Sequence, residues 1–252
     1  MASPTAGLDA SAALDTRPFV QAQDAYILRH PHLAPLPAKP AATVSDADIP
    51  TWLESEAAAQ HWPAADRDTM YLLYYPAETT VDVHGKKSCG AFDGYHHDGT
   101  GKNGASFVYG VVARCTQGAR ALDALTVATS HEIIETATDP FYYTGPAFGS
   151  TDDEHFIWTL LTVGEVSDMC ELDAEADARL VGKYMVARSW SNAAAAAGHD
   201  PCVPAPAQPY FSAAARLDDD VTLSAGSSEM PTKGVRVAVG ERRVVDVVLY
   251  SD

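Results

Sequence analysis

The stretch Ser130–Pro140, SHEIIETATDP, carries three side chains whose types and spacing suit metal-dependent hydrolysis. On a helix, His131 and Glu135 are one turn apart, so their side chains project from the same face and can bind one metal ion. Glu132 lies about 100° further around the helix. In the HExxH pattern of zinc proteases, the glutamate at this place takes a proton from the attacking water. We therefore expect His131 and Glu135 to be metal ligands and Glu132 to be a general base.

In this chain a glutamate, Glu135, stands where HExxH proteins have their second histidine. Carboxylate oxygen is an accepted ligand of zinc, and a carboxylate-rich site makes other divalent metals more competitive. We expect one zinc ion, with another divalent metal as the alternative. The competing interpretation is a chance match on the solvated face of a helix. The apolar and small residues around the motif favour a buried helix, in which ionisable side chains need partners.

A third metal ligand is expected about thirty residues downstream, in the segment GEVSDMCE (Gly164–Glu171). Glu165 and Asp168 are three residues apart and share one side of a helical turn. One of them can bind the metal while the other accepts a hydrogen bond from the ring of His131. An ordinary acidic turn is the alternative for this segment. His155 is a competing ligand, although its acidic neighbours favour a solvated loop.

The segment Lys86–Gly104 is rich in glycine and polar residues and contains the sequence Gly94–Tyr95–His96–His97. A connection of this length between two strands is expected to be a functional loop. His96, placed near a metal, could stabilise the oxyanion that forms when water attacks a peptide carbonyl. The alternative is a pair of surface histidines.

The helix that carries the motif is expected over Ala121–Asp139. Asp123 can cap its start, and Pro140 ends it because the residue before a proline disfavours the helical conformation. Apolar runs and their stop signals predict the other elements. These are helices over Thr51–His61 and Val163–Leu172, and strands over Met70–Tyr75, Ser106–Cys115 and Tyr184–Trp190.

Composition divides the chain into three parts. Residues 1–48 are rich in alanine and proline and are expected to form an extended arm. Residues 49–203 are expected to form the catalytic domain, an α+β fold of the metalloprotease kind in which the HExxE helix packs on a sheet. Residues 204–252 begin with a proline-rich linker and continue with the alternating runs VTL, KGVRVAV and RRVVDVVLY. This pattern predicts a small antiparallel β unit.

The charge of the chain argues against several classes of partner. Acidic residues outnumber basic ones by 34 to 17, which gives a formal net charge of -17. Nucleic acid and anionic lipid both attract basic surfaces, so neither is expected as a partner. No apolar run reaches the roughly 18–20 residues of a membrane span. We expect a monomer that acts on a peptide or protein substrate.

Four cysteines form two local pairs in the sequence, Cys89 with Cys115 and Cys170 with Cys202. None has the CxxC spacing of a thiolate zinc site. Two disulfides and four buried thiols both fit this number, and disulfides would indicate an extracellular protein. Met1–Asp15 lacks the basic and apolar regions of a signal peptide. A cytosolic protein and a mature secreted form are therefore both consistent with the sequence.

Together, these segments resemble the EXORDIUM-like, phosphate-induced protein family of plants and its bacterial relatives. In that family, a helix of the form HExxExxT(D/N)P is followed by a tryptophan-containing loop, then E(I/V)xDxC, then (Y/S)WSN and a final cysteine. The matching segments here are SHEIIETATDP, GEVSDMC and SWSN (Ser189–Asn192) with Cys202, preceded by Cys89 and Gly94–His96. Their order and approximate spacing agree over about Met70–Val203. The distance from the helix to Glu165 also resembles the gluzincin plan of zinc proteases.

The resemblance implies secretion, the disulfides Cys89–Cys115 and Cys170–Cys202, and a zinc-protease-like core. It does not cover the N-terminal arm or the C-terminal β unit. The resulting hypothesis is a secreted zinc-dependent endopeptidase of bacterial type. One alternative is a non-catalytic extracellular protein that the metal stabilises, and another is a carbohydrate- or cell-wall-binding module. The last ranks third because the C-terminal unit has only Tyr210, Phe211 and Tyr250 as aromatic residues.

Overall fold

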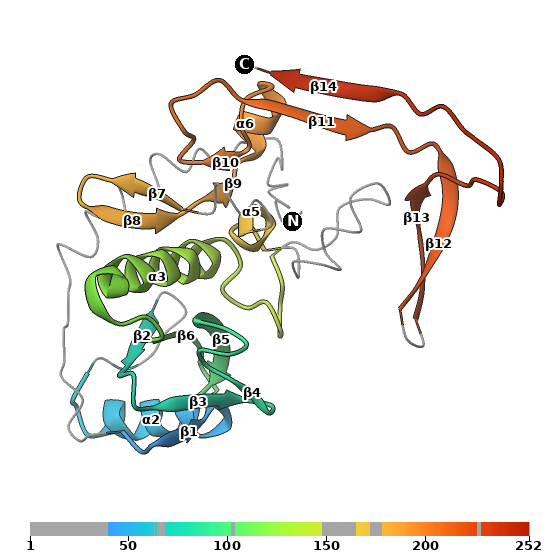
Figure 1. Cartoon of the computed structure of the whole chain (residues 1–252). Helices are drawn as coiled ribbons and strands as arrows, with labels where there is room; N and C mark the ends of the chain where they lie inside the picture. The colour runs from blue at the N-terminus through green and yellow to red at the C-terminus, as the bar shows by residue number, and fades with distance from the viewer. Residues whose placement is uncertain are drawn as a thin grey trace, which may run out of the picture. The chain divides into compact units, whose positions relative to one another are not determined.

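The computed structural model describes residues 40–62, 64, 69–101, 104–147, 165–171, 178–225 and 228–251. These residues fall into two compact units. The larger unit holds the described residues of 40–147 and 178–187, and the smaller unit holds those of 165–171 and 188–251. Both helices and small sheets are present (Figure 1), which agrees with the predicted α+β class. His155 and the first 39 residues of the predicted arm (residues 1–48) lie outside the described residues, whereas residues 40–48 are described.

A three-stranded sheet in the order β2-β6-β5 forms the centre of the larger unit. β2 (Met70–Tyr75) runs parallel to β6 (Ser106–Ala113), and β5 (Gly94–Thr100) pairs antiparallel with β6. The central strand β6 is buried from Phe107 to Ala113. Because side chains alternate along a strand, β6 presents apolar residues to both faces of the sheet.

Different layers cover the two faces of this sheet. On one face, Phe107, Tyr109 and Val111 pack with Ile49 and Leu53 of α2 (Ile49–Ala58). A second sheet of the same unit has the order β1-β3-β4, formed by β1 (Thr43–Ser45), β3 (Thr80–Val83) and β4 (Lys86–Lys87). On the other face lies α3 (Ala121–Thr138), between the central sheet and a hairpin (Figure 1). The hairpin consists of β7 (Ala178–Val181) and β8 (Tyr184–Ala187).

The helix α3 starts at the predicted residue and ends one residue earlier than predicted, but its capping residue differs. A short 3-10 helix, η2 (Gly118–Arg120), precedes it, and Arg120 takes the N-cap position without a side-chain cap hydrogen bond. Asp123 is therefore not the cap; it lies in the first turn, where a negative charge is still favourable. No described helix is long and apolar enough to cross a membrane.

Three strand predictions need correction. Lys86–Gly104 is not one loop, because it contains β4 and β5. The segment predicted over Tyr184–Trp190 is divided into β8 and β9 (Ser189–Trp190) by the buried Arg188. Of the run KGVRVAV, which was predicted as a strand, only Lys233 and Gly234 belong to one. They end β13 (Ser228–Gly234), which pairs with β12 (Asp219–Ala225).

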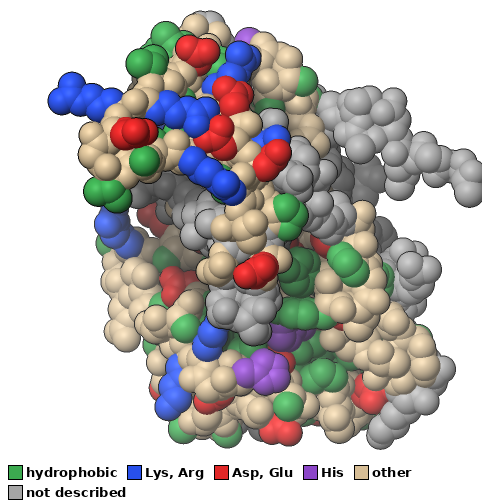
Figure 2. Space-filling model, turned by 90° about the vertical axis from the view of Figure 1, so that its right-hand side faces the viewer, with side chains coloured by type: hydrophobic (Ala, Val, Ile, Leu, Met, Phe, Trp, Pro, Cys, Tyr) green, Lys and Arg blue, Asp and Glu red, His purple; other side chains and the backbone are tan. Residues whose placement is uncertain are grey.

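The C-terminal part of the smaller unit contains two antiparallel ribbons. β11 (Phe211–Ala215) pairs with β14 (Val247–Ser251), and β12 pairs with β13. Lys and Arg side chains gather over this part together with Asp and Glu (Figure 2), and Lys233 Nζ lies 2.6 Å from Asp220 Oδ1. The charges here are thus partly compensated within the ribbons themselves.

Both expected disulfides are formed. Cys89–Cys115 closes a loop in the larger unit, and Cys170–Cys202 joins α5 (Asp168–Glu171) to β10 (Cys202–Val203) in the smaller unit. The two cysteines of a pair are separated by 26 and 32 positions respectively. Cross-links over loops of this length stabilise a fold by about 3 kcal/mol each, chiefly by restricting the unfolded chain.

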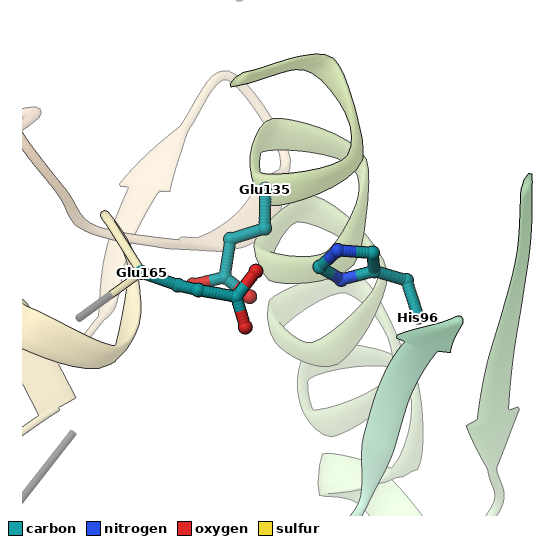
Figure 3. Close-up of side chains that lie close together, drawn as sticks. All are labelled: His96, Glu135 and Glu165. Atoms are coloured by element: carbon teal, nitrogen blue, oxygen red, sulfur yellow. The ribbon is translucent and has the colours of Figure 1, made fainter. Parts of the chain in front are cut away.

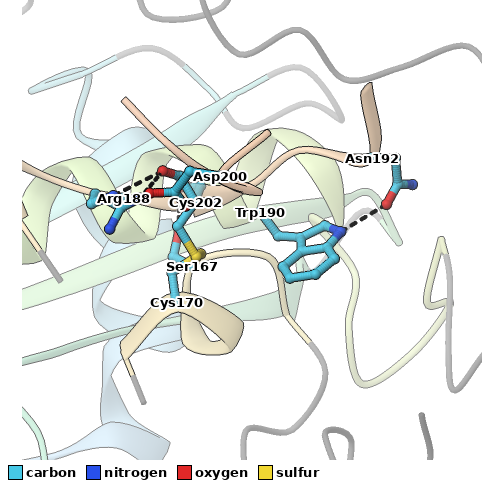
Figure 4. Close-up of a disulfide and its surroundings, with 8 residues drawn as sticks. Ser167, Cys170, Arg188, Trp190, Asn192, Asp200 and Cys202 are labelled. Atoms are coloured by element: carbon cyan, nitrogen blue, oxygen red, sulfur yellow. Dashed lines mark hydrogen bonds and ion pairs between the residues drawn. A yellow bond between two sulfur atoms is a disulfide. The ribbon is translucent and has the colours of Figure 1, made fainter. Parts of the chain in front are cut away.

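A buried ion pair organises the residues around the second disulfide. The Arg188 side chain is fully buried and donates to the Asp200 carboxylate and to the Cys202 carbonyl (Figure 4). Asp200 Oδ1 also accepts the Cys202 N–H at 2.9 Å. The alanine-rich stretch before Asp200 forms α6 (Asn192–Ala196), whose cap is the Ser191 side chain. Arg188 therefore needs Asp200 as its counter-ion.

We expect the substitution Asp200→Asn to lower the free energy of unfolding by about 3 kcal/mol, because it leaves the Arg188 charge buried without a carboxylate. Urea unfolding followed by circular dichroism measures this loss. The control Asp220→Asn removes an ion pair with Lys233 in which the Asp220 side chain is 90% exposed, and should change stability by less than about 1 kcal/mol. Equal losses in the free energy of unfolding for the two substitutions would contradict the prediction, because they would show that the buried pair stabilises the fold no more than the exposed one.

Candidate metal and catalytic site

His131 and Glu135 lie together on α3 as the helical spacing predicts. His131 Nε2 is 3.0 Å from Glu135 Oε2, and their side chains are 10% and 2% exposed. The backbone of α3 therefore places one nitrogen and one oxygen atom, each able to bind a metal ion, close together in a buried position. Such a pair is suited both to binding one metal ion and to a direct hydrogen bond.

The strand β5 brings His96 to the same helix, 36 residues away from Glu132 in the sequence. His96 Nδ1 is 3.3 Å from Glu132 Oε2, and His96 Nε2 is 3.3 Å from the Asp139 carbonyl oxygen. Figure 3 shows the His96 ring pointing from β5 toward the side of α3 that carries Glu135. Both His96 and Glu132 are buried. The structure thus holds His96, His131, Glu132 and Glu135 in one unit.

The contacts of His96 determine where its protons can be. A carbonyl oxygen only accepts, so the bond to Asp139 requires a hydrogen on Nε2. In the neutral ring this leaves Nδ1 as an acceptor, and it faces the Glu132 carboxylate, which also accepts when ionised. The contact is attractive only when one proton is shared between His96 and Glu132. These two residues are therefore arranged to hold and exchange a proton.

The close approach of β5 to α3 depends on Gly94. A Cβ atom at this position would lie 3.0 Å from Glu132 Oε1, 3.3 Å from Glu132 Cγ and 3.2 Å from the Val111 carbonyl oxygen. Contacts this short force the neighbouring groups to move, and the Val111 carbonyl is part of the backbone. Glycine at position 94 therefore leaves the space that the Glu132 side chain occupies.

Asp139 is buried at the end of α3 and sits in the TDP part of the motif. Its Oδ1 accepts the Ala147 N–H at 2.7 Å, whereas Oδ2 has no hydrogen-bond partner among the described residues. Burial raises the pKa of the Asp139 carboxyl, although the Ala147 hydrogen bond and the charge of His96 act in the opposite direction. Ionising this side chain thus costs more in the folded protein than in the unfolded chain.

Glu165 and Asp168 belong to the smaller unit, where the segments GEVSDMC and SWSN are joined. The backbone N–H of Trp190 donates to the Val166 carbonyl at 2.7 Å, and the Ser167 and Ser189 hydroxyl oxygens are 2.8 Å apart. Val166 and Ser167 are buried, while Glu165 and Asp168 on either side of them are half-buried. These contacts hold the backbone that carries both carboxylates. Figure 3 also draws Glu165.

The larger unit offers donor atoms that could hold a metal ion. A carboxylate oxygen of Glu135 lies within 4.8 Å of a ring nitrogen of His96, and a carboxylate oxygen of Glu135 also lies within this distance of a ring nitrogen of His131. All three side chains are buried, so water does not compete fully for their charges. Imidazole nitrogen together with carboxylate oxygen is a donor set that zinc accepts. The residues present therefore fit a zinc ion or a similar divalent metal.

Three residues that position the site were not expected from the sequence. Besides Gly94 and Asp139, the Ser130 hydroxyl accepts the Ala187 N–H at 2.8 Å and so ties α3 to β8. Ser130 and Asp139 both lie within SHEIIETATDP. Their position beside the candidate catalytic residues could have predicted a role in the site. Gly94 precedes the aromatic and histidine residues of β5, and its role depends on the pairing of β5 with β6.

We expect Asp139→Asn to stabilise the metal-free protein at neutral pH. Asparagine still accepts the Ala147 N–H but carries no charge that must be buried. Because the folded-state pKa of Asp139 is raised, the stability contribution of the acid is complete below its ordinary value of 3.8 and is lost as the pH rises through the raised value. The advantage of asparagine should therefore grow with pH, as urea unfolding at several pH values measures.

The control for this prediction is Asp82→Asn, which changes an aspartate that accepts the Gly85 N–H at 2.7 Å in an exposed turn. It should not reproduce the pH-dependent gain. A loss of stability in Asp139→Asn at neutral pH would contradict the prediction, because it would mean that the ionised carboxylate is the stabilising form.

Comparison with known proteins adds no relative to this arrangement. No protein-family model, no curated protein and no solved structure matches the chain. The function must therefore follow from the side chains themselves and from the order of the motifs in the sequence.

Proposed function

We propose that the chain is a metal-dependent hydrolase, with zinc as its metal and peptide bonds as its substrate. The observation that carries the proposal is the burial of two histidine–glutamate pairs, His131 with Glu135 and His96 with Glu132, on one side of α3. Burying four ionisable side chains together costs free energy unless partners or a bound ion offset it. Such clusters are therefore candidates for functional sites. Three of these residues have the order HExxE, which differs from the HExxH pattern of zinc proteases in the second ligand alone.

In this proposal, His131 and Glu135 are the core of the ligand set. Glu165 or Asp168 supplies a further carboxylate, as the spacing of these residues in the sequence predicts. When bound, zinc supplies Lewis acidity toward the substrate carbonyl and toward water. The number of carboxylates keeps other divalent metals as competitors. The two disulfides support an extracellular location, where such cross-links persist.

The protein's own residues handle the proton. Glu132 accepts a proton from the water molecule whose oxygen bonds to the carbonyl carbon of the substrate. His96 Nδ1, 3.3 Å from Glu132 Oε2, shares that proton, and the Asp139 carbonyl keeps the other ring nitrogen oriented. As the carbon–nitrogen bond of the peptide breaks, the proton goes to the leaving amine. Glu132 is thus the general base and then the general acid, and His96 assists it.

The second candidate is a non-catalytic extracellular protein in which the metal only stabilises the fold. The burial of the site favours this candidate, because His96, His131, Glu132 and Glu135 are each less than a tenth exposed. A structural metal site is closed by protein ligands, whereas a catalytic one keeps a position for water. Turnover distinguishes the two, since both candidates bind metal.

We expect Glu132→Gln to retain the metal and to lower peptide hydrolysis at least about 100-fold, because the amide cannot take the proton. Zinc content by mass spectrometry and cleavage of a casein substrate, with and without chelator, measure the two properties. The control Glu56→Gln changes a glutamate that pairs with His61 on the surface, 2.6 Å away, and should leave both properties unchanged.

A fully active Glu132→Gln variant would contradict the mechanism. Stoichiometric metal without cleavage in the wild type would favour the structural candidate. A wild-type protein that binds no divalent metal would contradict both.

We further expect that one of Glu165→Gln and Asp168→Asn weakens zinc binding at least about tenfold, because a lost ligand reduces affinity more than a lost supporting hydrogen bond. Competition with a chromogenic chelator measures the affinity. His131→Ala is the positive control, since His131 is expected to be a ligand. Unchanged affinity in both carboxylate variants would place the remaining ligands within the larger unit.

A further inference from the structure

A second polar cluster, half-buried, lies on the opposite side of β5, around Asp46. This aspartate lies in η1 (Asp46–Asp48), at the start of the described chain. Its Oδ1 accepts hydrogen bonds from the hydroxyls of Tyr95 and Tyr109, both at 2.7 Å, and its Oδ2 is 3.1 Å from His97 Nδ1. One carboxylate thus joins three side chains from β5 and β6 that are distant from it in the sequence.

The register of the strands places this cluster directly behind His96. Tyr95 pairs with Val111 and His97 pairs with Tyr109, whereas His96 between them pairs with Gly110. Because successive side chains of a strand point to opposite faces, Tyr95 and His97 face Asp46 while His96 faces α3. Asp46 therefore holds both neighbours of His96, one on each side.

The carboxylate remains charged in this place. Burial alone would raise the pKa of Asp46, but the hydrogen bonds from His97, Tyr95 and Tyr109 outweigh it, so the pKa lies below its ordinary value. Burial and the negative charge of Asp46 together raise the pKa of nearby Tyr75 to about 12. Hydrogen bonds to an ionised acceptor are shorter and about twice as strong as neutral ones, so this cluster holds its partners firmly.

The cluster also reaches the segment that follows α3. The ring of His97 makes an edge contact with the ring of Tyr143, with centroids 4.8 Å apart. The next residue, Thr144, donates to Asp98 of β5 at 2.5 Å. This segment begins at Asp139, whose carbonyl oxygen accepts from His96. The contacts of His97 thus support both the strand that carries His96 and the segment that carries its hydrogen-bond acceptor.

We propose that Asp46 is a positioning residue for His96: by holding Tyr95, Tyr109 and His97, it keeps the His96 ring between Glu132 and the Asp139 carbonyl. The effect on turnover rests on the proposed hydrolase function. The effect on the His96 ring does not, because it concerns contacts within the larger unit of the metal-free protein.

The test uses Asp46→Ala and Asp46→Asn in the full chain, with Asp48→Asn as the control in the same short helix, where the side chain is exposed. The primary readout is the imidazole nitrogen spectrum of metal-free protein, with the His96 signals identified from a His96→Gln variant. Asp46→Ala should shift or broaden the His96 signals. Asp46→Asn should restore them in large part, because its amide oxygen still accepts from both tyrosines. Asp48→Asn should match the wild type.

The second readout is peptide hydrolysis by the zinc-loaded protein. Asp46→Ala should lower kcat about tenfold and leave KM within about twofold, since the ring that shares the proton is misplaced. If Asp46→Ala does not fold, the double substitution Tyr95→Phe and Tyr109→Phe replaces it, because it removes two hydrogen bonds and keeps both rings.

His96 signals that are unchanged in a folded Asp46→Ala or double-phenylalanine variant would overturn the proposal, even when the melting temperature falls. A wild-type protein without hydrolytic activity would overturn the proposed function instead, and the nitrogen spectrum would still decide the role of Asp46.

Discussion

The contact between His96 and Glu132 is the constraint on which the arrangement of the larger unit depends. It joins an edge strand to the helix that lies across the sheet, and both partners are removed from solvent. Two ionisable groups can be buried in this way only when each has a partner and a proton is correctly placed between them. The helix, the strand and the segment after the helix must therefore all keep their positions for the pair to persist.

Several local features follow from this requirement. At Gly94, β5 comes so close to the Glu132 side chain that a Cβ atom would require Glu132 or the Val111 carbonyl to shift. Ser130 ties α3 to the hairpin on its other side through the Ala187 N–H. Asp139 ends the helix and offers the carbonyl that orients His96, while its own carboxylate is buried at a cost. A residue with unfavourable burial that is kept next to a candidate catalytic group is more consistent with function than with stability.

The sequence predicts the parts of this site that depend on local spacing. The position of His131 relative to Glu135 follows from the helical repeat, and the local pairs of cysteines match the two disulfides, although the sequence alone also allowed four thiols. The strand β5 was predicted as a loop because glycine and polar residues dominate it, although Tyr95 and His97 alternate with His96 as in a half-buried strand. The role of Asp46 could not be predicted from the sequence around it. Its hydrogen-bond partners are 49, 51 and 63 positions away and contact it only in the folded protein.

The same contacts set a condition for the proposed catalysis. In the proposed hydrolase, a substrate carbonyl could approach Glu132 only if the space around the carboxylate opened, because Glu132 is 5% exposed. Movement of β5 would break the hydrogen bonds to the charged Asp46 as well as the pairing with β6. The segment after α3 also contacts β5: Thr144 donates to Asp98, the ring of Tyr143 packs on His97, and the Asp139 carbonyl accepts from His96. Opening a path to Glu132 would therefore break contacts of His96 and His97 on either side, so in the proposed hydrolase substrate entry and the position of His96 would be linked.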